Sequence, residues 1–195
     1  ADVGDHDITV TCTDGSSATA SDEYTLTVTN TNDAPTVANA ISDVSTAEDA
    51  AYSLSVASVC TDVDSGDSLT YSISGAPSTI TISGTTISGT PVNANVGAHT
   101  ITVTCTDGSS ATASDQYVLT VTNTNDAPTV ASAIADASTN EDAAYSLNVA
   151  GTCTDVDSGD SLTYTISGAP STITISGTTI SGTPVNANVG AHTIT

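Results

Sequence analysis

The stretch TDVDSGDSLTYSISG occupies residues 61–75, and it returns almost unchanged as TDVDSGDSLTYTISG at residues 154–168. Each copy places three aspartates within six residues and continues with alternating apolar and hydroxyl side chains. Alternation with a period of two, rich in Ile, Thr and Tyr, is typical of a β-strand with one buried face. The stretch therefore predicts an acidic turn that leads into a strand, and the chain contains this turn and strand twice.

The repetition extends far beyond this stretch. Residues 126–195 match residues 33–102 at 62 of 70 positions, and residues 1–32 match residues 94–125 at 27 of 32 positions. The chain is thus a tandem array of a 93-residue unit, a period too long for a solenoid repeat and close to the size of a small β-sandwich domain. We expect three parts: 1–32, the C-terminal strands of a preceding repeat; 33–125, a complete domain; and 126–195, an incomplete domain that lacks its last two strands.

The composition limits the classes of function. The 195 residues include 22 acidic side chains and no Lys or Arg, which gives a formal net charge of −22. Nucleic acids and anionic membrane surfaces are bound through Lys and Arg, so neither is an expected partner. No apolar run approaches the ~20 residues of a membrane helix, and the alternating patterns indicate a folded chain. No acid, base and nucleophile stand together outside the repeat pattern, so we do not expect an enzyme.

Strand patterns and turn clusters alternate along each unit, which predicts an all-β fold of tandem immunoglobulin-like sandwiches. Without Phe, Trp or Met the core is small, and small cores usually need a crosslink. Cys60 and Cys105 lie 45 residues apart, near the end of an early strand pattern and inside a late one, as in the inter-sheet disulfide of immunoglobulin domains. We expect them to be joined; a pair of buried free thiols is the alternative. Regularly placed single cysteines in such an acidic chain favour an oxidising, extracellular setting.

Several motifs in each unit resemble the cadherin repeat. TDVDSGDSLTYSI resembles its D-x-D-x-G turn and Tyr-bearing strand, TNTNDAP resembles its linker ending in N-D-N-A-P, and CTDGSS resembles its A-T-D-G-G. ISGTPVNANVGAHTITVTCTDG is similar to the dystroglycan-type and bacterial cadherin-like, or "putative Ig", repeats. The resemblance spans the whole unit, and it implies cadherin-like sandwiches in series, as in extracellular surface or filament proteins.

In cadherins the matching positions bind calcium between successive domains, and calcium takes about six to eight oxygen ligands. The resemblance therefore implies structural calcium at each junction. Before residue 36 the implied ligands are Asn32, Asp33, Asp62, Asp64 and Asp107. Before residue 129 they are Asn125, Asp126, Asp155 and Asp157, with Glu48 and Asp49 from the preceding domain and Asp14 from an adjoining copy. We expect Asp67 and Asp160 in an outer shell or in solvent.

The sequence departs from the cadherin pattern in two ways that reduce the number of ions. ISGTP at residues 87–91 replaces the acidic L-D-R-E stretch, and the linker has lost one Asn. We therefore expect one or two ions per junction at most. The alternative is that the aspartates are solvated turn residues, because Asp favours turns without any metal. Crowding favours the metal, because two carboxylates ~4 Å apart repel by ~1 kcal/mol in water and by more at lower dielectric.

These features indicate a structural protein: an extracellular fibre or stalk of tandem sandwiches with calcium-stiffened joints. The alternative is the repeat region of a cell-surface adhesin that binds carbohydrate or a partner cell. The surface is rich in Ser and Thr, which permits O-linked glycan without showing it.

The expected partners are neighbouring copies, joined head to tail. Residues 126–195 and residues 6–31 would each expose unpaired strand edges, and the second segment has the sequence and length that the first one lacks. Either the repeats continue in one chain, which the absence of a marked terminus favours, or separate subunits join by strand addition. Both arrangements pair Cys153 with Cys12 of the adjacent copy.

Overall fold

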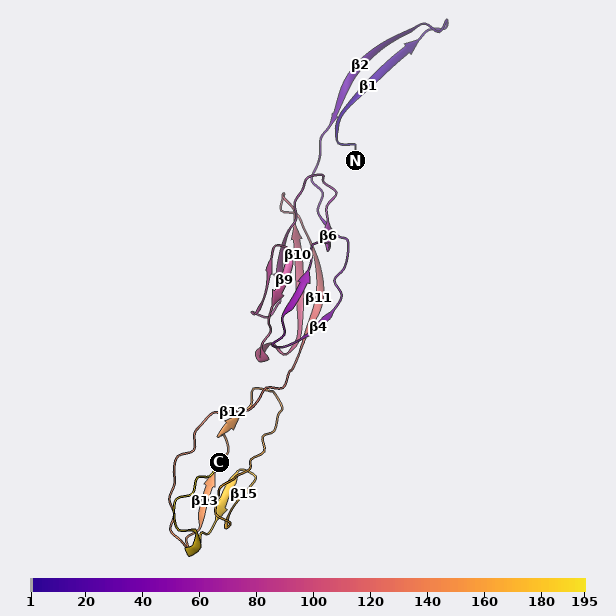
Figure 1. Ribbon diagram of the computed structural model, residues 1–195. Helices are drawn as coiled ribbons and strands as arrows, with labels where there is room; N and C mark the ends of the chain where they lie inside the picture. Colours follow the sequence, from indigo (N-terminus) through magenta and orange to yellow (C-terminus); the bar gives the residue numbers. More distant parts are fainter. Residues whose placement is uncertain (1) are drawn as a thin grey trace. The chain divides into compact units, whose positions relative to one another are not determined.

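The computed structural model describes residues 2–195, which divide between Thr122 and Asn123 into two compact units. All regular elements of the described chain are β-strands or single 3₁₀ turns, so the all-β prediction is confirmed (Figure 1). The first unit contains β1 (Gly4–Thr13), β2 (Thr19–Val28), β3 (Thr36–Val37), β4 (Val44–Ala47), β5 (Tyr52–Ser55), β6 (Cys60–Thr61), β7 (Thr70–Ser74), β8 (Ile80–Ser83), β9 (Thr86–Gly89), η1 (Asn93–Asn95), β10 (Gly97–Thr106) and β11 (Thr112–Thr122). The second contains β12 (Thr129–Val130), β13 (Tyr145–Asn148), β14 (Cys153–Thr154), β15 (Ile173–Ser176), β16 (Thr179–Gly182) and η2 (Asn186–Asn188). No helix among these elements has the length and apolar content to cross a membrane.

The first unit contains one full sandwich. Its larger sheet has the order β4-β11-β10-β7, in which β4 runs parallel to β11 and the remaining pairs are antiparallel. Its other sheet has the order β5-β9-β8, and β3 pairs with β6. Alternation places every second side chain of these strands in one shared core, as the period of two predicts.

The core of the sandwich is aliphatic, with two tyrosines and one disulfide. Cys60 in β6 is bonded to Cys105 in β10, so the expected disulfide is present and ties together strands of two different sheets. Tyr52 and Tyr117 bring their hydroxyl groups within 3.1 Å of each other. Burial raises the pKa of both phenols, so the two groups remain neutral hydrogen-bonding partners inside the core.

The second unit repeats only part of this architecture. The sheet β13-β16-β15 corresponds to β5-β9-β8, and the pair β12-β14 corresponds to β3-β6. The described residues form no counterpart of the four-stranded sheet, and residues 163–167, which match β7, are not a strand. A β-strand requires a hydrogen-bonding neighbour, and here the only backbone bonds to this segment join Ser167 and Thr195 in the described chain.

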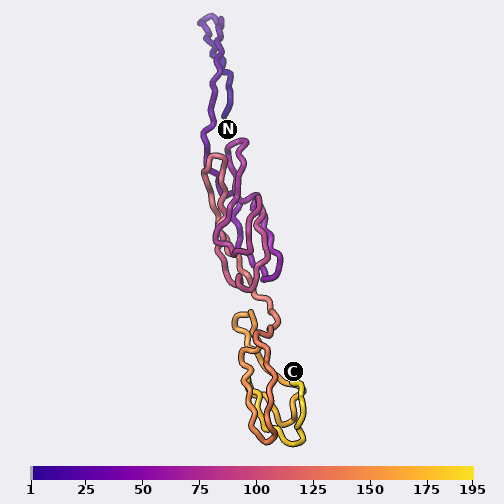
Figure 2. The backbone as a smooth tube through the Cα atoms, turned by 90° about the vertical axis from the view of Figure 1, so that its left-hand side faces the viewer, coloured from indigo at the N-terminus to yellow at the C-terminus, as the bar shows by residue number. Residues whose placement is uncertain are grey.

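The remaining element is a separate two-stranded hairpin. β1 and β2 lie side by side in both views (Figure 1, Figure 2) and pair in antiparallel register from Gly4 opposite Val28 to Thr13 opposite Thr19. Its side chains are almost all exposed. An isolated two-stranded hairpin is marginally stable in water.

Candidate metal centre

A cluster of three carboxylates lies in the turn after β6. Asp62, Asp64 and Asp67 each place one carboxylate oxygen within 4.8 Å of the other two. The turn itself creates this cluster: the Asp64 N–H donates to Asp62 Oδ1 at 2.8 Å, and the Asp67 N–H donates to the Asp64 carbonyl oxygen at 3.3 Å. Gly66 reverses the chain with a φ of 97°, a conformation that favours glycine.

One oxygen of this cluster is left without a partner. Asp62 Oδ2 is buried and accepts no hydrogen bond from the residues that the structure describes. A buried acceptor in this state is costly, and the chain has no Lys or Arg to neutralise it. Oxygen-only ligands on a turn are the set that calcium prefers. The residues present therefore fit a calcium ion.

The linker that enters the sandwich is held by the same turn. The Asp33 N–H donates to Asp64 Oδ2 at 2.7 Å, and Asn32 Nδ2 donates to Asp107 Oδ2 at 2.9 Å. Asp67 also approaches this region, because its Oδ1 lies 3.3 Å from the position that a Cβ on Gly108 would occupy. The linker, the D-x-D-x-G turn and the TDG turn thus meet at one end of the sandwich.

Asp107 is the most constrained carboxylate of this group. Its Oδ1 accepts hydrogen bonds from the backbone N–H groups of Ser109 and Ala111, at 2.9 and 2.7 Å. The bond from the Asn32 amide lowers the pKa of Asp107 below its usual value; burial opposes this shift, and the backbone N–H groups add to it. Asp107 therefore stays ionised in mildly acidic solution.

This shift predicts how stability depends on pH. An Asp in the unfolded chain titrates near ~3.9, and Asp107 titrates lower in the folded state, so its stabilising effect is present above pH ~4 and is lost as the pH falls through the folded pKa. We expect Asp107→Asn, measured by urea unfolding in calcium-free buffer, to flatten the loss of stability below pH ~4. The control is Asp14→Asn, because Asp14 makes the same turn in the hairpin outside the sandwich. Parallel pH profiles for the wild type and Asp107→Asn would contradict the assignment.

The second unit builds the same cluster again. Asp155, Asp157 and Asp160 have carboxylate oxygens within 4.8 Å of one another. The Asp157 N–H donates to Asp155 Oδ1 at 2.9 Å, and the Asp126 N–H donates to Asp157 Oδ2 at 2.8 Å. These bonds reproduce those of the first unit one repeat later, so the arrangement follows from the repeated sequence.

The other predicted ligands make hydrogen bonds within their own units. The Glu48 N–H donates to the carbonyl oxygen of Thr122, at the end of β11, and the Asp49 N–H donates to the carbonyl oxygen of Pro91. Asn125 donates its amide to the Asp126 carbonyl oxygen at 2.9 Å. The roles of these residues and of Asp14 as calcium ligands at the second junction stay predictions.

The structure brings one further aspartate into each cluster. Asp67 and Asp160, expected in an outer shell or in solvent, each place an oxygen within 4.8 Å of an oxygen of the other two aspartates, and their role toward an ion stays a prediction. The spacing D-x-D-x-x-D around a glycine carries this signal, because a turn with a left-handed glycine brings the sixth residue back beside the first.

Comparison with known proteins gives a family and a fold. A family described as "Putative Ig domain" matches residues 34–122 and 127–195. A search of curated protein sequences finds no match. Among solved structures, extracellular cadherin domains 1–4 of protocadherin gamma B7 are similar over 94% of this chain and 49% of that one, with 19% identity and a TM-score of 0.50. This likeness shows a cadherin-like fold.

Two further solved structures have lower TM-scores. The human desmocollin-1 ectodomain is 16% identical over 97% of this chain and 40% of that chain, with a TM-score of 0.42. An endo-fucoidan hydrolase from glycoside hydrolase family 107 is 22% identical over 98% of this chain and 31% of that chain, with a TM-score of 0.43. The chain thus spans less than half the length of these three structures.

Proposed function

Since the chain belongs to the "Putative Ig domain" family, we propose that it is a structural protein of an extracellular fibre or stalk, built from tandem sandwiches whose joints calcium stiffens. Immunoglobulin-like repeats are typically not enzymes. The disulfide between Cys60 and Cys105 supports an extracellular location, because such bonds persist in oxidising surroundings.

The observation that carries the proposal is the recurrence of one acidic turn beside each linker. In both units a backbone N–H of the linker donates to the central aspartate of the cluster, Asp33 to Asp64 and Asp126 to Asp157. Whatever fixes the carboxylates of the cluster therefore also fixes the chain where it enters the next sandwich. A fibre that carries mechanical tension requires that the linker be held rigidly, and in the same way, at the start of every sandwich.

Calcium would supply the positive charge that this chain lacks. The carboxylates of Asp62, Asp64 and Asp67 would hold the ion in the first unit, with Asp62 Oδ2 as the oxygen that has no other partner in the described chain. Asp107 and the linker amides orient the surrounding groups through the hydrogen bonds described above. Neutralising the cluster removes the mutual repulsion of its carboxylates.

The near identity of the repeats favours a fibre over a binding array. Of 70 aligned positions in the last two repeats, 62 are identical, so their surfaces are nearly uniform. A protein that binds several ligands gains from loops that differ between its domains, whereas a uniform rod gains from loops that do not. The adhesin alternative predicts instead that the isolated chain binds a glycan array.

Calcium removal is the direct test of the metal centre. An ion that binds only the folded state stabilises it by RT ln(1 + [L]/Kd), which is ~2.7 kcal/mol at a hundredfold excess over Kd. We expect chelator to lower the melting temperature, measured by differential scanning calorimetry, while circular dichroism retains the β signature. Asp62→Asn should abolish the calcium response of the first unit.

The matched control is Glu23→Gln, which removes one negative charge from the hairpin and installs the residue that the next repeat carries at Gln116. This variant should respond to calcium as the wild type does. Melting curves of the wild type that coincide in calcium and in chelator would show that the aspartates serve only as turn residues.

A further inference from the structure

We propose that the pairing of β4 with β11 is a mechanical latch, which keeps the first sandwich closed when the chain is pulled along its length. Two aspartates, Asp43 and Asp115, reinforce the latch, and the disulfide limits how far the chain lengthens once the latch opens. The inference rests on the proposed function for the source of the tension. It deepens that function, because it names the element of the sandwich that resists the tension.

β4 and β11 lie where tension enters and leaves the sandwich. The linker at Asp33 leads through β3 to β4, and β11 ends at Thr122, directly before the next linker. β3 pairs with β6 over only two residues, whereas β4 and β11 lie side by side in the larger sheet (Figure 1). Tension on the chain therefore acts on β4 from its N-terminal end and on β11 from its C-terminal end.

The two strands run in parallel, from Val44 opposite Leu119 to Ala47 opposite Thr122. Pulling β4 toward its N-terminus and β11 toward its C-terminus slides one strand along the other. The hydrogen bonds between the strands lie across this direction, so they resist the sliding together and do not open one at a time. The Glu48 N–H, which donates to the Thr122 carbonyl oxygen at 2.9 Å, adds one more bond after the last pair.

The two aspartates extend this ladder beyond the N-terminal end of β4. The Ile41 N–H donates to Asp115 Oδ2 at 2.6 Å, and the Val118 N–H donates to Asp43 Oδ1 at 2.7 Å. Hydrogen bonds to an ionised acceptor are roughly twice as strong as those between neutral groups. Each of the two segments supplies one donor and one acceptor, so the segments cannot slide without breaking both bonds.

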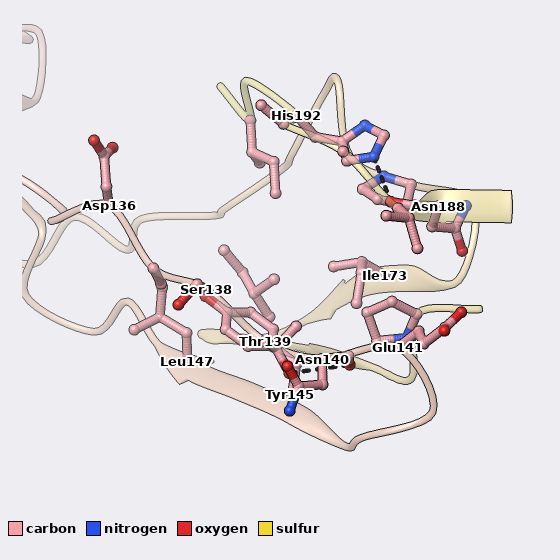
Figure 3. A pocket seen from close by; sticks show the side chains of 18 of the residues that line it. Asp136, Ser138, Thr139, Asn140, Glu141, Tyr145, Leu147, Ile173, Asn188 and His192 are labelled. Atoms are coloured by element: carbon pink, nitrogen blue, oxygen red, sulfur yellow. Dashed lines mark hydrogen bonds between the residues drawn. The ribbon is translucent and has the colours of Figure 1, made fainter. Parts of the chain in front are cut away.

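The acceptors of the latch recur with the repeat. Asp136 takes the position of Asp43, and Asp22 takes the position of Asp115. The described residues form the pairing itself only in the first sandwich. In the second unit Asp136 lines a cavity and lies apart from the other labelled side chains (Figure 3). The geometry of the latch thus comes from the first sandwich, and the repeated sequence supplies the same acceptors elsewhere.

The disulfide limits the extension that follows when the latch opens. Cys60 in β6 and Cys105 in β10 close a loop over a sequence separation of 45 residues. Residues 61–104 lie inside this loop, so tension passes through the two sulfur atoms and cannot lengthen that part of the chain. Only the segments before Cys60 and after Cys105 extend, and β4 and β11 belong to those segments.

The experiment pulls single molecules of the 195-residue chain in an optical trap. Cys12 and Cys153 are free thiols on either side of the first sandwich, so DNA handles attach there through maleimide groups without any substitution. The other two cysteines are joined to each other and do not react. Calcium is held constant in all measurements, so that the linker contributes equally to each.

Reduction of the disulfide after the handles are attached should lengthen the unfolding step by roughly 150 to 160 Å. This is the extended length of the loop that the bond closes over its separation of 45 residues. The other segments are the same in both states, so their lengths cancel in the difference. An unfolding step that reduction leaves unchanged would contradict the limit on extension.

Asp115→Ala should raise the rate of unfolding at a given force roughly tenfold, because the Ile41 N–H then loses its acceptor. Asp43→Ala should raise the rate less, because Asp43 is exposed and water weakens its bond. Asp115→Asn keeps a side-chain oxygen as acceptor and should restore part of the loss. The rates come from the distribution of unfolding forces, since forced unfolding is governed by the unfolding rate.

The matched control is Asn95→Ala, inside the loop that the disulfide closes. Asn95 Oδ1 accepts hydrogen bonds from the Val92 N–H at 3.0 Å and from the Thr79 hydroxyl at 2.9 Å. In urea, Asn95→Ala and Asp115→Ala should both be less stable than the wild type. Under force, Asn95→Ala should unfold at the wild-type rate while the disulfide is intact. An intact disulfide in each variant, shown by mass spectrometry, indicates that the sandwich has folded.

An unfolding rate under force that Asp115→Ala leaves unchanged would overturn the inference, as would an equal acceleration by Asn95→Ala. The outcome is separable from that of the proposed function. Filaments of a protein whose sandwich shows no such latch leave the fibre intact and remove the latch, whereas a latch measured in a protein that forms no filaments does the reverse.

Discussion

Replacing both Cys60 and Cys105 with alanine is expected to lower the free energy of unfolding of the first sandwich by about 3 to 4 kcal/mol. The bond closes a loop of 45 residues, and on the chain-entropy description a crosslink over such a loop restricts the unfolded chain by about this amount. Urea unfolding, followed by circular dichroism, measures the change. A loss of this size is a large fraction of the stability of a small domain.

The matched control is the variant in which both Cys12 and Cys153 are alanine. These residues form no disulfide within the chain, so their removal leaves the crosslink in place. We expect the unfolding midpoint of this control, measured at low protein concentration, to stay close to that of the wild type. Equal losses in the two double variants would contradict the assignment of stability to the Cys60–Cys105 bond.

Leu119→Ala is expected to cost about 2 to 5 kcal/mol of stability. Leu119 is fully buried in β11, where it packs within the core between the two sheets, and removing a buried isobutyl group leaves a cavity as well as a loss of apolar burial. The same denaturation measurement, with thermal unfolding as a second readout, determines the size of the effect.

The repeat provides an internal control for this substitution. Leu26 occupies the same position of the same strand pattern in the hairpin, yet it is exposed. Leu26→Ala should therefore leave the stability of the first sandwich unchanged in dilute solution. If Leu119→Ala reduced the stability as little as Leu26→Ala, the result would contradict the placement of β11 in the core.

The sequence predicts the covalent and repeating features of the fold well, because they depend on local pattern and spacing. The period of two indicated the strands, and the 45-residue spacing indicated the Cys60–Cys105 bond. The parallel pairing of β4 with β11 was not predicted, because it joins segments far apart in the chain through side chains with no distinctive pattern.

The second unit shows why local pattern is insufficient. Residues 70–74 and residues 163–167 have nearly the same sequence, but only the first segment is a strand, paired with β10. The second lacks this partner among the described residues. A segment with a high strand propensity forms a strand only when a neighbouring strand pairs with its backbone. The sequence of the segment itself does not show whether that neighbour is present.

The candidate metal centre was predictable in position and less so in composition. The acidic turn and the linker were identified from the resemblance, and the structure does bring Asp33, Asp64 and Asp107 into one hydrogen-bonded region through the linker. The inclusion of Asp67 depends on how the turn folds around Gly66, which residue types alone do not reveal.

Electron microscopy of the protein in calcium, beside the same sample in chelator, tests the central claim most directly. The account predicts uniform filaments in calcium that bend more or shorten when the ion is removed. Without calcium, the carboxylates of the acidic turn beside each linker repel one another, and the linker is held less rigidly. Dispersed particles that remain separate in calcium at all protein concentrations, and that are unchanged by chelator, would contradict it.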